Sequence, residues 1–406
     1  MQALPAVTVV MQIHPDDLDW LTGPRAAAAL ERLVDRDTRS VEVAASLRKE
    51  FSAERARLLL QQAELRRRGV KKFAQAARML FTPRGLEQAT DEVVAAYKAE
   101  RFPTDGPLAD LCCGIGGDLT ALAGRAEVFA ADLDPVCARC AAWNCRAVGR
   151  TATVSCRDVT ESSLTGFAAW HIDPDRRPAG SRTSQVLHSS PGIDVIEALQ
   201  RQCPHAAIKL APAACAPEHW GAAAEREWIS RDGECKQQVA WFGQLARRAG
   251  DRSATVLRSG QRRTVFGSSA SILEPASAIG RYLYDPDAAI LAARLVPALA
   301  AECGLCAIDL ASAYVTGDDP VHDLALSAFE VLDVLPLDVK QLRAWLRRRG
   351  IGKLEIKKRG INLDPPRLLR KLAPSGEEQA TLIGTRFQRR IVAVLCRRPA
   401  TPRPTG

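Results

Sequence analysis

The spacing of apolar residues changes near residue 107. Between residues 13 and about 100, leucines such as Leu18, Leu21 and Leu30 recur at helical spacing among Ala, Arg and Glu. Breaks fall near Gly23-Pro24 and at Gly69. The pattern predicts an N-terminal helical region over residues 1–103, built from several short helices rather than one coiled coil.

Beyond residue 107, short apolar runs alternate with helical stretches. This alternation, with short loops, predicts a parallel sheet with helices on both faces, and therefore an α/β, Rossmann-like fold. The predicted strands cover residues 108–113, 127–132, 152–156, 168–173 and 206–210, and the predicted helices cover 119–125, 136–149 and 193–203. Two further predicted strands, 233–242 and 253–258, are expected to form an antiparallel pair at one edge of the sheet.

A stretch of small residues at 273–280 predicts a domain boundary. Helices are expected after it over 286–303 and 337–349, and strands over 353–357 and 390–396. The predicted organisation is a helical region (1–103), a Rossmann-like domain (104–275), a small α/β domain (276–398) and a disordered tail (399–406).

Positive charge is concentrated near the C-terminus. The chain has a formal net charge of +9, and residues 343–398 hold sixteen Lys or Arg against four acidic residues. A cationic surplus confined to one segment favours a polyanionic partner, and nucleic acid is a better explanation than a merely solvated surface because the basic residues recur over several predicted elements.

The sequence predicts a cytoplasmic protein. Its first residues lack a basic segment, and no apolar run reaches the roughly 18 residues of a membrane span, so no membrane association is expected. The twelve cysteines then belong to a reducing compartment. The pairs Cys137/Cys140 and Cys303/Cys306 lie far apart in the sequence, so no metal site is expected.

The most informative motif is a glycine-rich turn between a predicted strand and a predicted helix. It reads Asp110-Leu-Cys-Cys-Gly114-Ile-Gly116-Gly117-Asp118. Such glycines allow a sharp turn and a close approach to a ligand. Leu119 breaks the dinucleotide pattern G-x-G-x-x-G, and the Lys-Ser/Thr pair of a phosphate-binding loop is absent. An acidic residue beside a glycine turn remains, which suits S-adenosyl-L-methionine (AdoMet) with its sulfonium, amino and carboxylate groups.

Acidic residues also follow the next two predicted strands. Asp132 ends the second strand, where a carboxylate can accept hydrogen bonds from both ribose hydroxyls. Asp158 follows the third strand, close to the expected position of the adenine amino group. Three acids at successive strand ends, after a glycine turn, are stronger evidence for a cofactor than any one of them, because Asp is common in turns.

The sequences DLCCGIGGD and AADLDP resemble the first two motifs of class I AdoMet-dependent methyltransferases. The resemblance implies that Asp110, Gly114 and Gly116 bind the methionine part, that Asp132 binds the ribose and that Asp158 lies near adenine. We add Cys112 and Gly117, within the same turn, to the predicted cofactor-binding residues.

The segment after the fourth predicted strand matches the position of the catalytic loop in this fold. In amino-methylating members the loop carries an acid or amide, two prolines and an aromatic residue. This chain keeps Asp173-Pro174 and then departs from the pattern, with Asp175 and Arg176 in place of the second proline and the aromatic residue. We predict Asp173, Pro174 and Asp175 as catalytic residues.

Two arginines continue the same loop. Arg176 and Arg177 are predicted to clamp a phosphate or stack on a base of RNA. The alternative is a salt-bridged turn. The loop holds no cysteine, so nucleophilic cysteine catalysis is not predicted there.

The flanking regions carry a second resemblance. Val70-Lys-Lys-Phe73, Met79-Leu-Phe-Thr82 and Gly85-Leu-Glu-Gln-Ala-Thr90 lead into the glycine turn. This layout resembles bacterial methyltransferases with a C-terminal THUMP-like domain and, more distantly, RNA cap guanine-N2 methyltransferases. THUMP domains are RNA-binding modules, and the tail motif around Lys353 looks like that domain. The resemblance implies RNA as a partner, with phosphate contacts from Lys353, Lys357, Lys358 and Arg359.

The sequence thus predicts an AdoMet-dependent methyltransferase that modifies a base in tRNA or rRNA and docks the RNA through its basic C-terminal domain. One alternative is a methyltransferase of a protein or small molecule. Another is a non-catalytic AdoMet-binding, RNA-binding protein. The RNA type, the methylated atom and the oligomeric state are not predicted.

Overall fold

The computed structural model describes residues 13–175, 190–268, 272–309 and 312–399, and the chain divides into two compact units. The first unit comprises Met1–Leu210, Ala214–Ala224 and Val239–Ala249. The second unit comprises Ala211–Ala213, Glu225–Gln238 and Gly250–Gly406. None of the helices in the described ranges combines the length and apolar character needed to cross a membrane.

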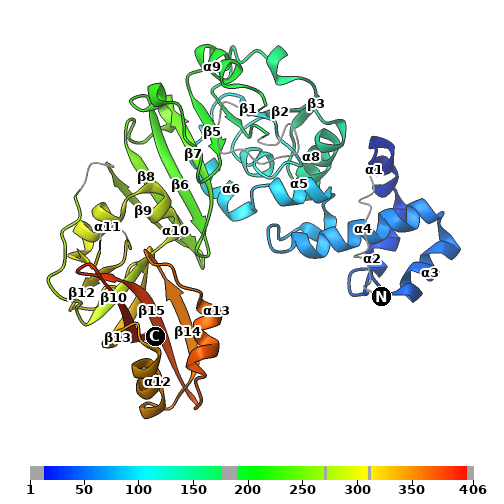
Figure 1. The fold of residues 1–406 in the computed structure, drawn as a ribbon. Coiled ribbons are helices and arrows are strands. Elements are labelled where there is room, and N and C mark those ends of the chain that lie inside the picture. Colours follow the sequence, from blue (N-terminus) through cyan, green and yellow to red (C-terminus); the bar gives the residue numbers. More distant parts are fainter. Residues whose placement is uncertain (1–12, 176–189, 269–271, 310–311, 400–406) are drawn as a thin grey trace, which may run out of the picture. The chain divides into compact units, whose positions relative to one another are not determined.

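The first unit opens with the predicted helical region (Figure 1). Its elements are α1 (Pro15–Leu21), α2 (Pro24–Arg32), α3 (Val41–Glu50), α4 (Ala53–Gly69), η1 (Ala76–Arg78), α5 (Pro83–Gln88) and α6 (Glu92–Ala99). Both predicted breaks are confirmed. Pro24 is the first residue of α2, where a backbone N–H would have no acceptor within the helix, so proline is tolerated there. Helix α4 ends at Gly69.

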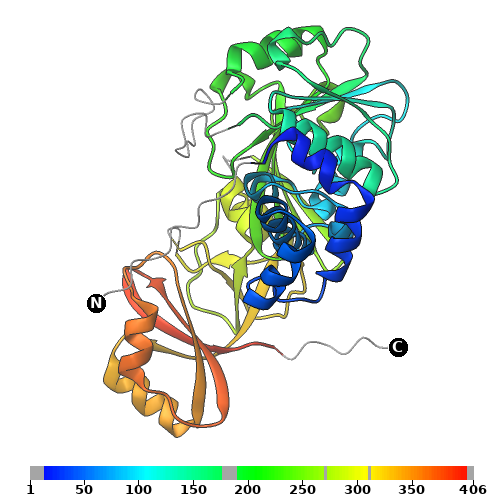
Figure 2. The same cartoon turned by 90° about the vertical axis from the view of Figure 1, so that its right-hand side faces the viewer.

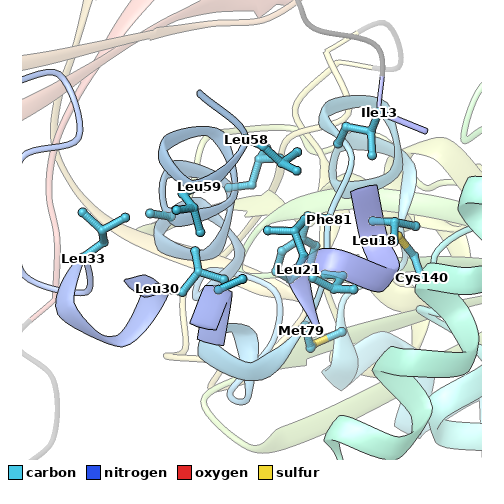
Figure 3. Packing of buried hydrophobic residues seen from close by; sticks show 14 of the residues in the cluster. Ile13, Leu18, Leu21, Leu30, Leu33, Leu58, Leu59, Met79, Phe81 and Cys140 are labelled. Carbon is cyan, nitrogen blue, oxygen red and sulfur yellow. The ribbon is translucent and has the colours of Figure 1, made fainter. Parts of the chain in front are cut away.

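These helices share an apolar core with the sheet domain that follows. Figure 3 shows Leu18 of α1 next to Cys140, which lies on the helix after the second strand. Ile115, in the glycine turn, belongs to the same cluster as Leu58 and Phe81. The helical region is therefore packed onto the sheet domain rather than tethered to it.

A parallel sheet forms the centre of the first unit. Its strands are β1 (Leu108–Leu111), β2 (Val128–Asp132), β3 (Thr153–Cys156), β4 (Ala169–Ile172) and β5 (Ala206–Leu210), with α7 (Leu119–Leu122), α8 (Pro135–Ala147), η2 (Val159–Glu161) and α9 (Ile193–Gln202) between them, and η4 (Glu218–Trp220) and η5 (Gly243–Leu245) after β5. The order is β3-β2-β1-β4-β5, followed by β7 (Glu234–Phe242). All four pairs among β1–β5 are parallel, which confirms the Rossmann-like prediction.

The strand order reverses between β1 and β4. From β1 the chain progresses to β2 and β3 on one side, and then returns to β4 and β5 on the other side. In open α/β sheets, the crevice at the carboxyl ends of two such strands is where ligands bind. Asp110 of β1 lies directly opposite His171 of β4 at this point.

The second unit holds the remaining strands of that sheet and a second sheet. Strands β6 (Ala224–Arg231), β8 (Arg252–Arg258) and β9 (Gln261–Gly267) continue from the first half of β7 in the order β7-β6-β8-β9. The predicted antiparallel pairing of residues 233–242 with 253–258 is wrong, because β6 lies between these strands and pairs with β8 in parallel.

The second sheet has seven strands in the order β11-β12-β10-β13-β16-β15-β14. The strands are β10 (Tyr282–Pro286), β11 (Cys306–Ala307), β12 (Val315–Gly317), β13 (Leu326–Pro336), β14 (Ile351–Lys358), β15 (Glu378–Phe387) and β16 (Arg390–Arg397), and the helices are α10 (Ala288–Ala293), α11 (Val296–Cys303), α12 (Val339–Arg348) and α13 (Pro365–Leu372). The single helix predicted over 286–303 is divided, because Arg294 adopts a left-handed conformation at the end of α10.

Helices α12 and α13 lie side by side on one face of the second sheet (Figures 1 and 2). Each follows a β-α-β path: β13 leads through α12 to β14, and β14 leads through α13 to β15. Leu342, Trp345 and Leu368 of these helices form a core with Leu382 and Leu395 of the strands. The opposite face of the same strands packs in a separate cluster.

The predicted boundary between residues 275 and 276 does not coincide with the division into two units. Val256 and Val265, on β8 and β9, share a core with Tyr284 and Ile290, which follow that boundary. Strands β8 and β9 therefore pack with the C-terminal part of the chain.

Asn144 of α8 connects three segments of the first unit. Its amide nitrogen donates to the carbonyl oxygens of Leu80 and Ile115, both at 2.9 Å, and its oxygen accepts from the N–H of Leu80 at 2.7 Å. The side chain is fully buried. We expect Asn144→Ala to lower the free energy of unfolding by about 2–4 kcal/mol, because buried backbone groups lose their partners.

Urea unfolding followed by circular dichroism measures this loss. Arg146→Ala, at an exposed position of the same helix, is the matched control and should change the free energy by less than about 0.5 kcal/mol. Equal effects of the two substitutions would contradict a stabilising role for the Asn144 hydrogen bonds.

Candidate functional site

A cavity of about 550 Å³ opens at the carboxyl ends of β1, β2 and β4, within the first unit. Its volume falls within the roughly 300–1,000 Å³ typical of small-molecule sites. Its lining comes from α5 with the residues that follow, the glycine turn, the end of β2 with the start of α8, the segment after β3, the residues after β4, and Ser190-Pro191. The predicted residues in its lining are Asp110, Cys112, Gly114, Gly117, Asp132, Asp158, Asp173, Pro174 and Asp175.

The path of the glycine turn depends on positive φ angles at three of its residues. Cys112, Gly114 and Gly116 have φ values of 54°, 56° and 88°. Gly116 is the one predicted cofactor residue outside the cavity lining, and a Cβ there would lie 3.2 Å from the Cα of Ala141. A Cβ on Gly117 would lie 2.7 Å from the carbonyl oxygen of Thr90. These two glycines allow the turn to pack closely against its surroundings.

Asp132 is anchored to the glycine turn. Its Oδ2 accepts a hydrogen bond from the N–H of Gly114 at 2.7 Å, and its Oδ1 accepts one from the N–H of Asp134 at 2.9 Å. Burial raises the pKa of the Asp132 carboxyl above its usual value, although both backbone N–H groups oppose the shift. Asp158, at the end of β3, accepts from the N–H of Thr160, which lowers its pKa.

Asp110 and His171 are joined across the reversal point of the sheet. His171 Nδ1 lies 2.8 Å from Asp110 Oδ1, and both side chains are buried. The other carboxylate oxygen, Asp110 Oδ2, is buried and has no hydrogen-bond partner among the described residues. Burial raises the pKa of Asp110, opposed by His171. An acceptor with spare capacity therefore lies against the cavity.

Behind this pair lies a buried ionic cluster. Lys98 of α6 contacts Asp118 Oδ1 at 2.6 Å and His171 Nε2 at 3.2 Å, and the Thr90 hydroxyl donates to Asp118 Oδ2 at 2.6 Å. Because an ammonium group only donates, the network assigns the His171 proton to Nδ1, which donates to Asp110. Burial raises the pKa of Asp118, but the positive charges of Lys98 and Lys209 bring it well below its usual value.

Both carboxylates of the loop after β4 are paired with cations from other segments. Lys209 of β5 lies 2.5 Å from Asp173 Oδ2. Arg84 of α5 lies 2.6 Å from Asp175 Oδ2, and Gln88 donates to Asp175 Oδ1 at 3.4 Å. The structure thus brings all three predicted catalytic residues to the cavity. Arg176 and Arg177 lie outside the described residues.

Three cysteine side chains in the cavity lining are neutral thiols. Cys112, Cys113 and Cys137 line it, and burial together with the nearby Asp132 raises the pKa of each thiol above its usual value. Within the ranges that the structure describes, no group of three or more His, Cys, Asp or Glu side chains is arranged to hold a metal ion.

The predicted RNA-binding lysines of the second unit do not share one face. Side chains alternate along β14, so Lys353 and Lys357 point to one side and Lys358 to the other, where Leu354 and Ile356 meet the helices. Lys357 and Arg359 both form ion pairs with Asp285, at 2.9 and 2.8 Å.

Comparison with known proteins places this architecture in one class. The chain is 32% identical over 343 residues to an uncharacterised S-adenosylmethionine-dependent methyltransferase found in two Mycobacterium tuberculosis strains, CDC 1551 / Oshkosh and H37Rv. That alignment covers 82% of this chain and 94% of each relative. A crystal structure from Porphyromonas gingivalis W83, provisionally assigned as a methyltransferase, matches with a TM-score of 0.76 at 19% identity and covers 93% of this chain and 99% of that one.

A family model described as THUMP domain-like matches residues 326–398, which run from β13 to just beyond β16. The fold is that of a Rossmann-like methyltransferase with a THUMP-like C-terminal domain. The chain belongs to the family of S-adenosylmethionine-dependent methyltransferases that the mycobacterial relatives represent, and S-adenosylmethionine is its cofactor.

Sequence reasoning missed the cations that surround the site. Lys209 had a visible signal, since a lysine within the apolar run of a central strand needs a partner. Lys98 and Arg84 lie on helices of mixed composition and gave no such signal. His171 stands one residue before the end of β4, as Asp110 does in β1, so its place near a strand end was a visible signal.

The buried pair Lys98–Asp118 yields a prediction for stability. We expect Lys98→Met to lower the free energy of unfolding by about 3–5 kcal/mol, because the Asp118 carboxylate stays buried without its closest cation. The double variant Lys98→Met, Asp118→Asn should lose less. Urea unfolding of the purified variants compares them.

Lys71→Met, at an exposed position, is the control for loss of a lysine and should stay within about 0.5 kcal/mol of the unmodified protein. If the double variant were destabilised by as much as Lys98→Met alone, the two side chains would not act as a pair.

Proposed function

We propose that this methyltransferase acts in the cytoplasm on a base of tRNA or rRNA, and that its THUMP-like domain docks the RNA. The observation that carries the proposal is the charge of residues 326–398, which hold seventeen Lys or Arg against seven acidic residues. Such a surplus favours a polyanionic partner, and a THUMP-like domain beside a methyltransferase favours RNA.

The cavity suits the cofactor. Seven Asp residues line the cavity. The basic side chains in the same lining are Arg84 and His171. AdoMet supplies an electrophilic methyl group on a positively charged sulfonium, and it carries a second positive charge on its amino group. An acidic wall is electrostatically complementary to both charges. The unpartnered oxygen of Asp110 is an acceptor of the kind that an ammonium group needs.

We assign roles along the cavity on this basis. Asp110 accepts from the amino group, and the turn containing Cys112, Gly114 and Gly117 forms the wall around the methionine part, with Gly116 supporting it from behind. Asp132 accepts from the ribose hydroxyls and Asp158 lies on the adenine side. Asp132 retains lone pairs for this, because each of its oxygens accepts one backbone N–H.

Asp173, Pro174 and Asp175 form the acceptor side of the site in this proposal. The cations Lys209 and Arg84 fix the two carboxylates, so the loop presents oriented hydrogen-bond acceptors to the target base. Methyl transfer depends mainly on in-line positioning of the two reacting atoms, and a rigid loop serves that need.

The raised pKa values of the cavity thiols argue against methyl transfer through a covalent bond between a cysteine and the base. Attack by a cysteine on a pyrimidine ring requires a thiolate, and the raised pKa values of Cys112, Cys113 and Cys137 leave these thiols protonated at neutral pH. Direct transfer to a nitrogen or oxygen atom of the base is the chemistry that these residues support.

Transfer of tritiated methyl from AdoMet to cellular fractions tests the substrate. RNA, protein and small molecules from a strain lacking the protein are offered separately, and Asp110→Asn is the inactive control. We expect label in RNA, and nuclease digestion then identifies the nucleotide. Label confined to the protein or small-molecule fraction would overturn the RNA assignment while leaving the methyltransferase activity intact.

The cofactor assignment yields a separate prediction for Asp132. We expect Asp132→Ala to raise the Kd for AdoMet at least tenfold, because a hydrogen bond to a charged acceptor contributes roughly 1.5–3 kcal/mol. Isothermal titration calorimetry measures the Kd. Glu127→Ala, which removes an exposed carboxylate just before the other end of β2, is the control and should leave it unchanged. An unaltered Kd in Asp132→Ala would remove Asp132 from the site.

A further inference from the structure

The outward faces of α12 and α13 carry only positive charge. Helix α12 contributes Lys340, Arg343, Arg347 and Arg348, all exposed. Helix α13 contributes Arg367, Arg370 and Lys371, also exposed. The eighteen residues of the two helices contain no Asp or Glu, whereas the composition of the whole chain would place about two there. We call these seven side chains the α12–α13 face.

Few internal contacts account for these cations. Arg343 Nε donates to the carbonyl oxygen of Lys371 at 2.6 Å, which joins the middle of α12 to the end of α13. The other six have no ion pair with any residue that the structure describes. Asp338 and Asp364 precede the two helices and are engaged as N-caps.

The arrangement works against helix stability. Arg343 and Arg347 are four residues apart, as are Arg367 and Lys371, and like charges at this spacing repel each other along a helix. A solvated helix normally alternates the two signs. Seven unneutralised cations on adjacent helices are therefore better explained by an external anion than by solubility.

The fold places the two rows of cations on one surface. Consecutive β-α-β crossovers put α12 and α13 on the same face of the sheet, and the two helices contact each other there. Their apolar sides, including Trp345 and Leu368, are buried against the strands, so their exposed cationic sides face outward together.

The sequence predicts the RNA contacts on and just after strand β14, but two of the cations there are already paired with a carboxylate. Lys357 and Arg359 share Asp285, and their side chains are each only 29% exposed. They also lie near aromatic rings, Lys357 over Phe329 and Arg359 over Tyr314. These contacts explain the two residues as part of the packing of the second unit.

We propose that the α12–α13 face is the surface on which the RNA backbone docks. The inference rests on the proposed function, in that RNA is taken as the substrate. Phosphate contacts from exposed Arg and Lys side chains position the RNA without reading its sequence. The one aromatic side chain of the two helices, Trp345, is buried, so base stacking contributes nothing and folded RNA is recognised by its shape.

Salt-dependent filter binding of unfractionated, end-labelled bacterial RNA to the full-length protein tests this surface. We expect Arg347→Gln with Arg370→Gln to weaken binding about tenfold near physiological salt and to reduce the slope of log K against log salt by about 1.5, because two phosphate contacts are lost. Lys353→Gln with Lys357→Gln, which removes two cations from the side of β14 that faces away from the helices, is the control and should leave the slope nearly unchanged.

The possible outcomes are separable. If the α12–α13 variant keeps the unmodified slope and the β14 variant loses it, the docking surface is wrong although RNA remains the ligand. If the unmodified protein shows no salt-sensitive RNA binding but is retained on phosphatidylserine vesicles, both this surface and the RNA substrate are wrong. AdoMet affinity, measured by calorimetry, should be the same in all variants, and the urea unfolding curve of the α12–α13 variant should match that of the unmodified protein, which shows that the cofactor site and the second unit are both intact.

Discussion

The hydrogen bond between His171 and Asp110 is the constraint on which the site depends. It joins β1 to β4 where the strand order reverses, and it leaves the second oxygen of Asp110 available at the cavity. A buried carboxylate needs compensation, and His171 provides it together with Lys98, which in turn is held by Asp118. The glycine turn, the helix α6 and the central strands are therefore fixed relative to one another by one set of buried polar contacts.

The central sheet could be predicted from the sequence because its signals are local. Each of β1–β5 is a short apolar run between turn residues, and β1 to β4 each end within two residues of an Asp. Strand β6 gave no such signal. Its Glu225 and Glu227 look like surface residues, yet they are buried, with Ser253 and Thr255 of β8 as their hydrogen-bond donors. Partners on another strand decide such cases, and a single sequence does not reveal them.

The same limit applies to the site. The carboxylates could be placed because the ends of parallel strands meet at one edge of a sheet, but the cations that hold them come from α5, α6 and β5. The result is a division of charge between the two units. Carboxylates line the cavity of the first unit, whereas the THUMP-like segment carries a cationic surplus. In the function proposed above, each surface meets a ligand of opposite sign, and the acidic cavity repels the phosphate backbone of the RNA.

Helix α5 has a consequence for dissecting the protein. Arg84 and Gln88 hold Asp175 from this helix, and residues Thr82 to Thr90 form part of the cavity wall. A fragment that starts at the first strand of the sheet would lack that wall and would expose the apolar surface that the helical region covers. The smallest segment able to retain the intact cavity must therefore extend upstream of the Rossmann-like core, and the helical region and the sheet have to be expressed together.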